Sequence, residues 1–319
     1  MRRRFAPLAS LLLAVSAVAA ACGGSSGGDA YDLLYKAIDS DRDPVQVNVG
    51  FALTDGSMSV EIDSSQIGFV MDKEGGSGAV HVSIPVDSLG ADASVLTDLG
   101  FTGDAIDLDV VFDGEALYAR SPLVGSLLEA LLAETGGLPD GDLGGWLRFG
   151  TEAELSGLME ALGGTAALPS SSFPPAGNAG ELKSSLEGAG ITLKNEGRED
   201  HNGVDSNHIS VAIDVEKLLA SEYLESADAG SLESARTTLS ELDLDINLWL
   251  EASSGHLAEI DVNAASTTNS DQTAELTLRF RDPDGSIPTD APDDFVELPI
   301  TELVEDLLPM LLGGGMLGL

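Results

Sequence analysis

Residues 242–262 read LDLDINLWLEASSGHLAEIDV, and the alternation in this segment decides the fold. From Leu242 to Leu250 every second residue is leucine or isoleucine, while Asp, Asn and Trp stand between them. A period of two predicts a strand with one apolar and one polar face. Ser254 and Gly255 predict a turn, after which residues 257–262 alternate again. The segment therefore predicts an antiparallel hairpin with one buried face.

The same period recurs along most of the chain, so the predicted sheet is extensive. Asp113-Gly114 and Asn202-Gly203 are strong hairpin turns between such segments. The pattern predicts roughly nine or ten antiparallel strands. Besides the first hairpin, the predicted strand segments are 45–53, 80–86, 106–112, 117–119, 146–149, 191–195, 209–213 and 274–280.

Other segments have the period of amphipathic helices. Residues 122–135 are an example, closed by Gly136 and Gly137. A sheet with one apolar face needs elements packed against that face, and these helices supply part of the cover. Periodicity leaves open whether they fill the space or leave a cavity. The predicted helices are 31–39, 122–135, 152–162, 179–186, 214–224, 229–239 and 300–312.

The N-terminus has the pattern of a lipoprotein signal peptide over residues 1–21. Three arginines precede a short apolar run that ends in Ala19-Ala20-Ala21, as a cleavage site requires. The next residue, Cys22, is the only cysteine of the chain. Its thiolate can take a diacylglyceryl group and its freed amine an acyl chain, which are the only attached groups we expect, with no other cofactor. Ordinary Ala-x-Ala cleavage, leaving a free thiol, is the alternative.

The segments around the signal indicate an anchored extracytoplasmic protein. Residues 22–30 form a Gly/Ser-rich tether, which gives an anchored domain its reach. We expect the anchor to lie in the outer face of the cell membrane, or in the outer membrane if the source has two membranes. No later run is long enough for a transmembrane helix. Residues 300–319 form an amphipathic to apolar helix and tail.

The net charge of −39 argues against two classes of partner. Phosphate backbones are repelled by such a surface, so nucleic acid is excluded as a partner. Anionic lipid headgroups are repelled too, so electrostatic attraction cannot hold the chain on a membrane and the covalent lipid becomes more necessary. Two acyl chains anchor stably, whereas one binds only marginally. The sequence names no protein partner.

No pattern in the sequence supports catalysis or metal binding. His81, His201, His208 and His256 are scattered, and none has a partner at a ligand spacing. The motifs of zinc proteases, P-loops and dinucleotide-binding folds are absent. Asp107 and Asp109 have the spacing of a solvated strand face. Trp249 stands on the polar side of its strand, either packed under a helix or exposed to a partner. We therefore expect neither an enzyme nor a metal site.

Several segments resemble the mycobacterial LppX and LprG lipoproteins. They are VVFDGEALYA at 110–119 followed by Trp146, DHNGVDSNHISVAID at 200–214, and the hairpin of 248–262 with AELTLRFRD at 274–282. More distantly, the pattern is similar to the lipid carriers LolA and LolB. The resemblance implies an α+β fold in which a strongly curved antiparallel half-barrel sheet carries helices on its concave face. It also implies an apolar cavity that carries acylated lipids or glycolipids between membranes of the envelope.

The resemblance sets the predicted domain organisation. One half-barrel domain is expected over residues 31–299, with helical inserts near 122–188 and 214–239 by which the chain departs from the family. Alternation alone assigns candidate lipid-binding residues on the apolar side of the sheet, and plain core packing is the alternative for each. They are Val47, Val49, Phe51, Val82, Ile84, Leu108, Val110, Ile209, Val211, Leu248, Leu250, Leu276 and Leu278.

Two functions of different classes follow from these patterns. The first is a membrane-anchored envelope lipoprotein that binds and transfers acylated lipid or glycolipid. Its physical basis is the burial of methylene groups, at about 0.8 kcal/mol each. The second is a structural or interaction lipoprotein whose core is filled and which binds no ligand. An extractable lipid would favour the first function, and a stoichiometric envelope partner would favour the second.

Overall fold

The structure is a computed structural model that describes residues 29–39, 42–56, 58–72, 75–86, 101, 103–135, 141–151, 177–221 and 229–298. The chain divides into two compact units. The first unit comprises the segments up to Arg42, Val47–Ser65 and Pro169–Asp282. The second comprises Asp43–Gln46, Gln66–Leu168 and Pro283–Leu319. The signal peptide, Cys22, the tether to residue 28, and the predicted helices 152–162 and 300–312 lie outside the described residues.

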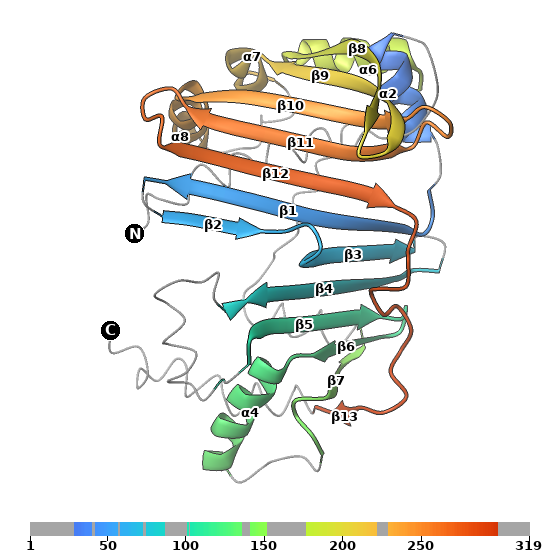
Figure 1. Cartoon of the computed structure of the whole chain (residues 1–319), viewed down its shortest axis with the longest axis vertical. Helices are drawn as coiled ribbons and strands as arrows, with labels where there is room; N and C mark the ends of the chain where they lie inside the picture. Colours follow the sequence, from blue (N-terminus) through green and yellow to red (C-terminus); the bar gives the residue numbers. More distant parts are fainter. Residues whose placement is uncertain are drawn as a thin grey trace. The chain divides into compact units, whose positions relative to one another are not determined.

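The first unit is built on an antiparallel sheet with the strand order β1-β12-β11-β10-β9-β8, with β2 paired to β1 (Figure 1). The first predicted hairpin forms: β10 and β11 pair with Leu248 opposite Ile260. The strands are β1 (Val45–Asp55), β2 (Met58–Ile62), β8 (Ile191–His201), β9 (Val204–Ile213), β10 (Leu242–Glu251), β11 (Leu257–Ser266) and β12 (Gln272–Arg281).

Helices α2 (Ala30–Asp39) and α6 (Ala179–Gly188) pack on the apolar face of this sheet. Leu33 and Leu34 of α2 are fully buried there, and burying a leucine contributes roughly 1.5–3 kcal/mol. Tyr31 fixes α2 in place, because its hydroxyl donates to Glu187 Oε1 (3.2 Å) and accepts from the amide of Leu193 (3.1 Å). Burial raises the pKa of Tyr31 further from neutrality.

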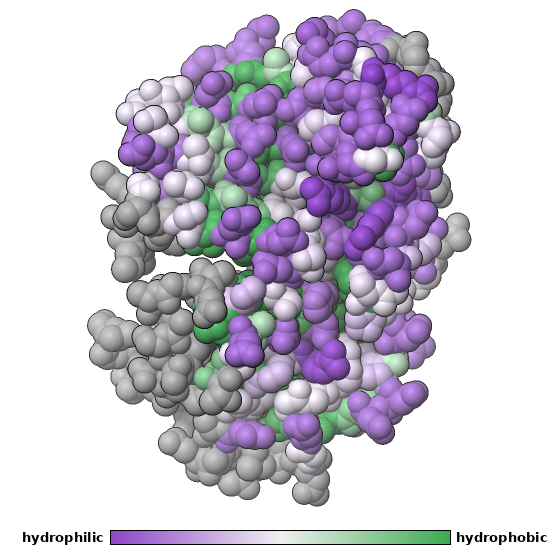
Figure 2. Space-filling model, in the orientation of Figure 1, coloured by the Kyte–Doolittle hydropathy of each residue, from purple (hydrophilic) through white to green (hydrophobic). Residues whose placement is uncertain are grey.

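The opposite face of the first unit's sheet is polar. Figure 2 shows hydrophilic side chains gathered over β8 to β12 on the side that it views. The alternating Asp, Glu and Asn residues of the strands account for this face, since successive side chains point to opposite sides. Two further helices follow strands of this unit, α7 (Val215–Leu219) after β9 and α8 (Ala229–Ser240) before β10.

The second unit has its own strand order, β13-β7-β6-β5-β4-β3. Its pairs are antiparallel except β13 with β7, which is parallel. Helix α4 (Pro122–Thr135) leads from β6 toward β7, and its Leu128 packs against the buried Leu143 and Leu147. The strands are β3 (Ile67–Asp72), β4 (Ser77–Pro85), β5 (Ala105–Phe112), β6 (Ala116–Arg120), β7 (Trp146–Thr151) and β13 (Val296–Glu297).

The predicted α+β class, an antiparallel sheet of the half-barrel type with packed helices, is confirmed. Two details differ from the prediction. The sequence indicated neither β2 nor β3, nor the short β13. A helix was expected over 214–224. Among the described residues of that range, up to 221, the helix is the shorter α7 (Val215–Leu219). In the described part of the chain, no helix has both the length and the apolar character needed to cross a membrane.

Candidate functional site

In the first unit, the candidate lipid-binding residues lie in or against a packed core. Ile209, Leu248 and Leu250 have exposed fractions of 0%. The side chains of α2 and α6 belong to the same cluster. The helices thus cover this part of the apolar face. The candidates placed in the cluster are Ile209, Val211, Leu248, Leu250 and Leu276, with Val49 and Leu278 partly buried against it; Val47 is buried and Phe51 partly buried.

In the second unit, the candidates lie on a face that is only half-buried. Val82 of β4 stands opposite Leu108 of β5, and Ile84 stands opposite Ile106. Directly opposed residues of an antiparallel pair share one side of the sheet. We define the apolar face as the side chains of Ile67, Phe69, Val80, Val82, Ile84, Ile106, Leu108 and Val110. Each of these is partly exposed.

The apolar face differs from the other side of the same strands. There Val70, Ala79 and Val111 are buried at 3%, 4% and 0% exposure and pack with Ile287. The second unit therefore closes one side of its sheet and leaves an apolar surface partly open on the other. At about 25 cal/mol per Å² of apolar area removed from water, such a surface favours an apolar occupant.

Asp109 is buried, which corrects the prediction of a solvated strand face at Asp107 and Asp109. Its exposed fraction is 4%. His81 Nδ1 lies 2.7 Å from Asp109 Oδ1, and Arg120 donates to Asp109 Oδ2 from Nη2 at 2.6 Å and from Nε at 3.1 Å. Asp107 accepts a hydrogen bond from Ser83 at 2.6 Å. Buried charges require such partners, and the alternation pattern does not reveal them.

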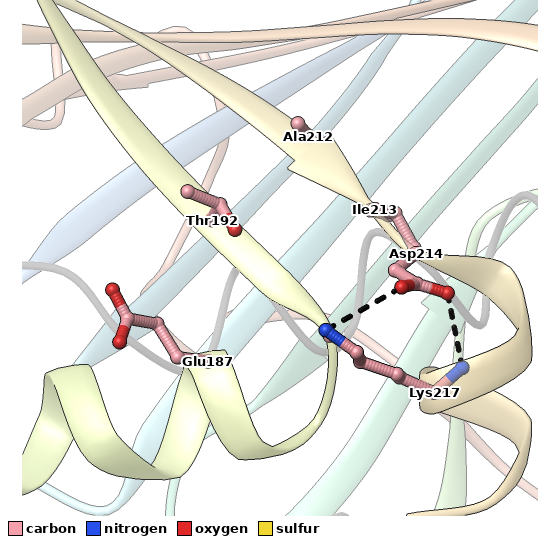
Figure 3. A pocket seen from close by; sticks show the side chains of 7 residues that line it. Glu187, Thr192, Ala212, Ile213, Asp214 and Lys217 are labelled. Carbon is pink, nitrogen blue, oxygen red and sulfur yellow. Dashed lines mark hydrogen bonds and ion pairs between the residues drawn. The ribbon is translucent and has the colours of Figure 1, made fainter.

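A pocket of about 550 Å³ opens in the first unit between α6, β8, β9 and α7. Its lining is polar, as Figure 3 shows, with Asp214 bonded both to the backbone amide of Lys217 (3.2 Å) and to its ammonium (3.6 Å). Asp214 is the N-cap of α7, so these groups serve the helix terminus. Ala212 and Ile213 are the only apolar side chains among its lining residues, which is too little apolar surface for an acyl chain. Its residues are Glu187, Gly190, Thr192, Ala212, Ile213, Asp214 and Lys217.

Trp249 is buried by histidines, and not by a helix, which was one of its two expected arrangements. Its ring stacks on His201 (centroids 3.9 Å apart) and on His208 (4.9 Å). Its Nε1 donates to Glu199 Oε1 at 2.8 Å. The exposed fraction of Trp249 is therefore 7% although it stands on the polar side of β10. The sequence signal, a lone Trp among acidic residues, could not name these partners.

Comparisons with known proteins find similarity in structure alone. No family model matches the chain, and no curated protein matches its sequence. Among solved structures, LprF from Mycobacterium bovis matches 84% of this chain and 100% of its own, with 12% identity and a TM-score of 0.34. The Mycobacterium tuberculosis lipoprotein LppX matches 77% of this chain and 89% of its own, with 11% identity and a TM-score of 0.28.

LppX is one of the two lipoproteins that segments of this sequence resemble. At these identities and TM-scores the matches assign no ligand. The function is therefore argued from the residues of this chain.

Proposed function

We propose that the chain is an extracytoplasmic lipoprotein, anchored through Cys22, that binds acyl chains on the apolar face of β3, β4 and β5. The carrying observation is the contrast within the second unit. One side of the sheet is closed around Val111, whereas the other presents Val82 and Leu108 half-buried. A contiguous exposed apolar surface more often marks a ligand-binding or interaction site than a surface without function.

Lipid transfer between envelope membranes is the finer form of this proposal. An acyl chain that enters the apolar face gains about 0.8 kcal/mol for each methylene removed from water. A membrane interior offers the same methylenes an equivalent environment, so the exchange is nearly balanced and reversible. A carrier that acts this way needs neither a catalytic residue nor a metal. We extend the proposal to acylated lipids or glycolipids on this ground.

The test uses the chain from residue 23 onward, incubated with phospholipid vesicles and repurified. Mass spectrometry of an organic extract should recover acyl chains bound in stoichiometric amount. Val82→Thr with Leu108→Asn places polar groups on the apolar face and should weaken retention roughly tenfold, equivalent to about 1.4 kcal/mol. Asp107→Asn changes the other side of β5 and serves as the matched control. Recovery of the bare protein mass from the unmodified chain would contradict the proposal.

The second candidate, an interaction lipoprotein with a filled core, has its own supporting observation. Leu248, Leu250 and Ile209 are fully buried under α2 and α6, so the first unit has the packing of a closed core. If no lipid is retained, affinity purification of the anchored chain should recover one envelope protein in stoichiometric amount. That result would favour the second candidate over the first.

A further inference from the structure

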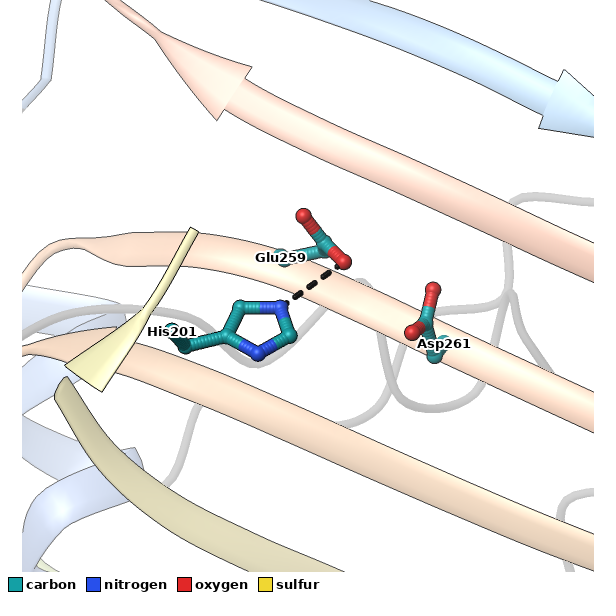
Figure 4. Close-up of side chains that lie close together, drawn as sticks. All are labelled: His201, Glu259 and Asp261. Atoms are coloured by element: carbon teal, nitrogen blue, oxygen red, sulfur yellow. Dashed lines mark hydrogen bonds and ion pairs between the residues drawn. The ribbon is translucent and has the colours of Figure 1, made fainter. Parts of the chain in front are cut away.

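A histidine and two carboxylates converge on the polar side of β11, within the first unit. His201 closes β8, and Glu259 and Asp261 are two residues apart on β11, so both carboxylates project from the same side (Figure 4). One side-chain donor atom from each of the three residues lies within 4.8 Å of the other two. His201 Nε2 is 2.9 Å from Glu259 Oε1.

Protein partners only partly satisfy this cluster. Glu259, 5% exposed, accepts at Oε2 from Arg279 Nε (2.9 Å) and from Asn202 Nδ2 (3.0 Å). Asn202 Nδ2 also lies 3.0 Å from His201 Nε2. That nitrogen cannot accept from Asn202 and donate to Glu259 at the same time. When His201 Nε2 accepts from Asn202, it carries no proton, and no hydrogen bond can form between His201 Nε2 and Glu259 Oε1.

Asp261 adds a second, independent observation. Its Oδ1 is buried and has no hydrogen-bond partner, while its carboxylate accepts from Thr277. Burial raises the pKa of Asp261, and the neighbouring Glu259 raises it further. An orphaned carboxylate oxygen beside another carboxylate costs free energy unless a cation compensates it.

We propose that His201, Glu259 and Asp261 bind one divalent transition-metal ion of the zinc type. Neutral imidazole together with carboxylate oxygen is a donor set that Zn²⁺ accepts, whereas Ca²⁺ requires six to eight oxygen ligands. Tetrahedral ligands about 2.0 Å from zinc lie roughly 3.3 Å apart, so small side-chain rotations complete the site. Arg279 contacts the oxygen of Glu259 that faces away from His201, and it holds that carboxylate in place.

The fluorescence of Trp249 reports on the proposed site. Weaker zinc binding elsewhere on this acidic chain should not change that fluorescence. The chain has two tryptophans, and the ring of Trp249 stacks on His201. In a chain from residue 22 onward carrying Trp146→Phe and Cys22→Ser, Zn²⁺ should change the Trp249 emission with a stoichiometry of one ion per chain. EDTA should reverse the change. Asp261→Asn and His201→Gln should each weaken the response at least tenfold, about the loss seen for groups that support metal ligands.

Two matched variants separate the proposed site from general histidine binding. His81 also pairs with a buried carboxylate, that of Asp109, to which Arg120 donates, but the described residues give His81 no third ligand. His81→Gln should therefore leave the Trp249 response unchanged. His208→Gln removes the ring on the other side of Trp249 and should leave zinc affinity unchanged as well. An emission that does not respond to Zn²⁺, or a response that survives Asp261→Asn or His201→Gln, would overturn the proposal.

Discussion

At the scale of single residues, the polar side of the first unit holds charge in two different ways. Arg42 is anchored by good partners: its Nη2 donates to Glu251 Oε1 at 2.5 Å, and its Nη1 donates to the carbonyls of Phe280 (2.8 Å) and Leu257 (3.3 Å). Burial alone would raise the pKa of Glu251, but hydrogen bonds from Ser254 and Arg42 outweigh it and hold that pKa below its ordinary value. The Nε of Arg42 has no hydrogen-bond partner, but it lies 3.4 Å from Asp282 Oδ1. Asp261 differs, because its buried Oδ1 has no hydrogen-bond partner, and burial and the neighbouring carboxylate of Glu259 raise its pKa.

Arg42→Ala should therefore lower the free energy of unfolding by about 3 kcal/mol, because the partly buried carboxylate of Glu251 and two carbonyls lose the donor that Arg42 supplies. Urea unfolding monitored by circular dichroism measures this loss. Arg198→Ala is the control, since Arg198 forms an exposed ion pair with Asp205 and should change stability little. Similar losses for the two variants would show that Arg42 is no more important than a surface arginine.

The Arg42 contribution should depend on pH through Glu251. A carboxyl whose pKa is lower in the folded chain stabilises it above the pKa of the unfolded chain, and that stabilisation is lost as the pH falls through the folded pKa. The difference in free energy of unfolding between the original chain and Arg42→Ala should accordingly become smaller at acid pH. A difference that stays constant from neutral pH into the acid range would contradict the assignment to Glu251.

Asp261→Asn should raise the free energy of unfolding, whereas Arg42→Ala should lower it. A carboxyl whose pKa is raised by folding destabilises the folded chain once the pH exceeds both of its pKa values. The substitution should thus raise the free energy of unfolding by about 1 kcal/mol at neutral pH in EDTA, since it removes a partly buried charge whose Oδ1 has no hydrogen-bond partner. The gain should fall toward zero as the pH is lowered and Asp261 takes up its proton. A loss of stability at neutral pH would contradict the account.

At the scale of elements, the strands of the first unit were predictable because their sides differ so clearly. The alternation of β10 and β11 fixes which residues face the core, and a slip of one residue would exchange the two sides. Strand β2 alternates over its five residues and was missed, whereas β3 has the consecutive apolar residues Phe69, Val70 and Met71 and does not show the pattern. Periodicity is a property of one segment, so it can place an element without placing its neighbours.

The polar cluster around Trp249 was beyond sequence reasoning for the same reason. Strand pairing sets Trp249 opposite His208 on one side and opposite Glu259 on the other. His201 and Glu259 are 58 residues apart, so no local spacing connects them. The apolar residues of the strands, unlike this cluster, could be listed from alternation. Their burial under α2 and α6 could not, because alternation within a strand does not show which helices pack on it.

Helix α2 should be essential for the first unit because it closes the apolar side of that sheet. Leu34 is 1% exposed within the core, whereas Ile38, one turn later, is 39% exposed. Leu34→Ala should lower the free energy of unfolding by about 3 kcal/mol, from lost burial and the cavity that remains. Ile38→Ala is the matched control on the same helix and should cost much less. Equal losses would mean that α2 does not close the core.

At the scale of the whole molecule, the net charge opposes membrane binding, whereas the proposed lipid anchor favours it. The net charge of −39 repels the anionic surface of a membrane, and removal of the proposed signal peptide would take away three arginines and increase that repulsion. Electrostatic attraction therefore cannot retain the mature chain. We propose that lasting membrane attachment comes from acyl chains on Cys22, whose methylenes would be buried in the bilayer.

Cys22→Ser should consequently move the protein from the membrane fraction to the soluble fraction of the cell envelope. For the unmodified chain, a high-salt wash should leave the protein on the membrane, because salt screens charge but does not weaken burial of methylene groups. Detergent should release it. Immunoblots of the fractions, together with the intact mass of the N-terminal peptide, measure both effects. Release of the unmodified chain by salt, or membrane retention of Cys22→Ser, would contradict the lipid anchor and favour attachment through a protein partner.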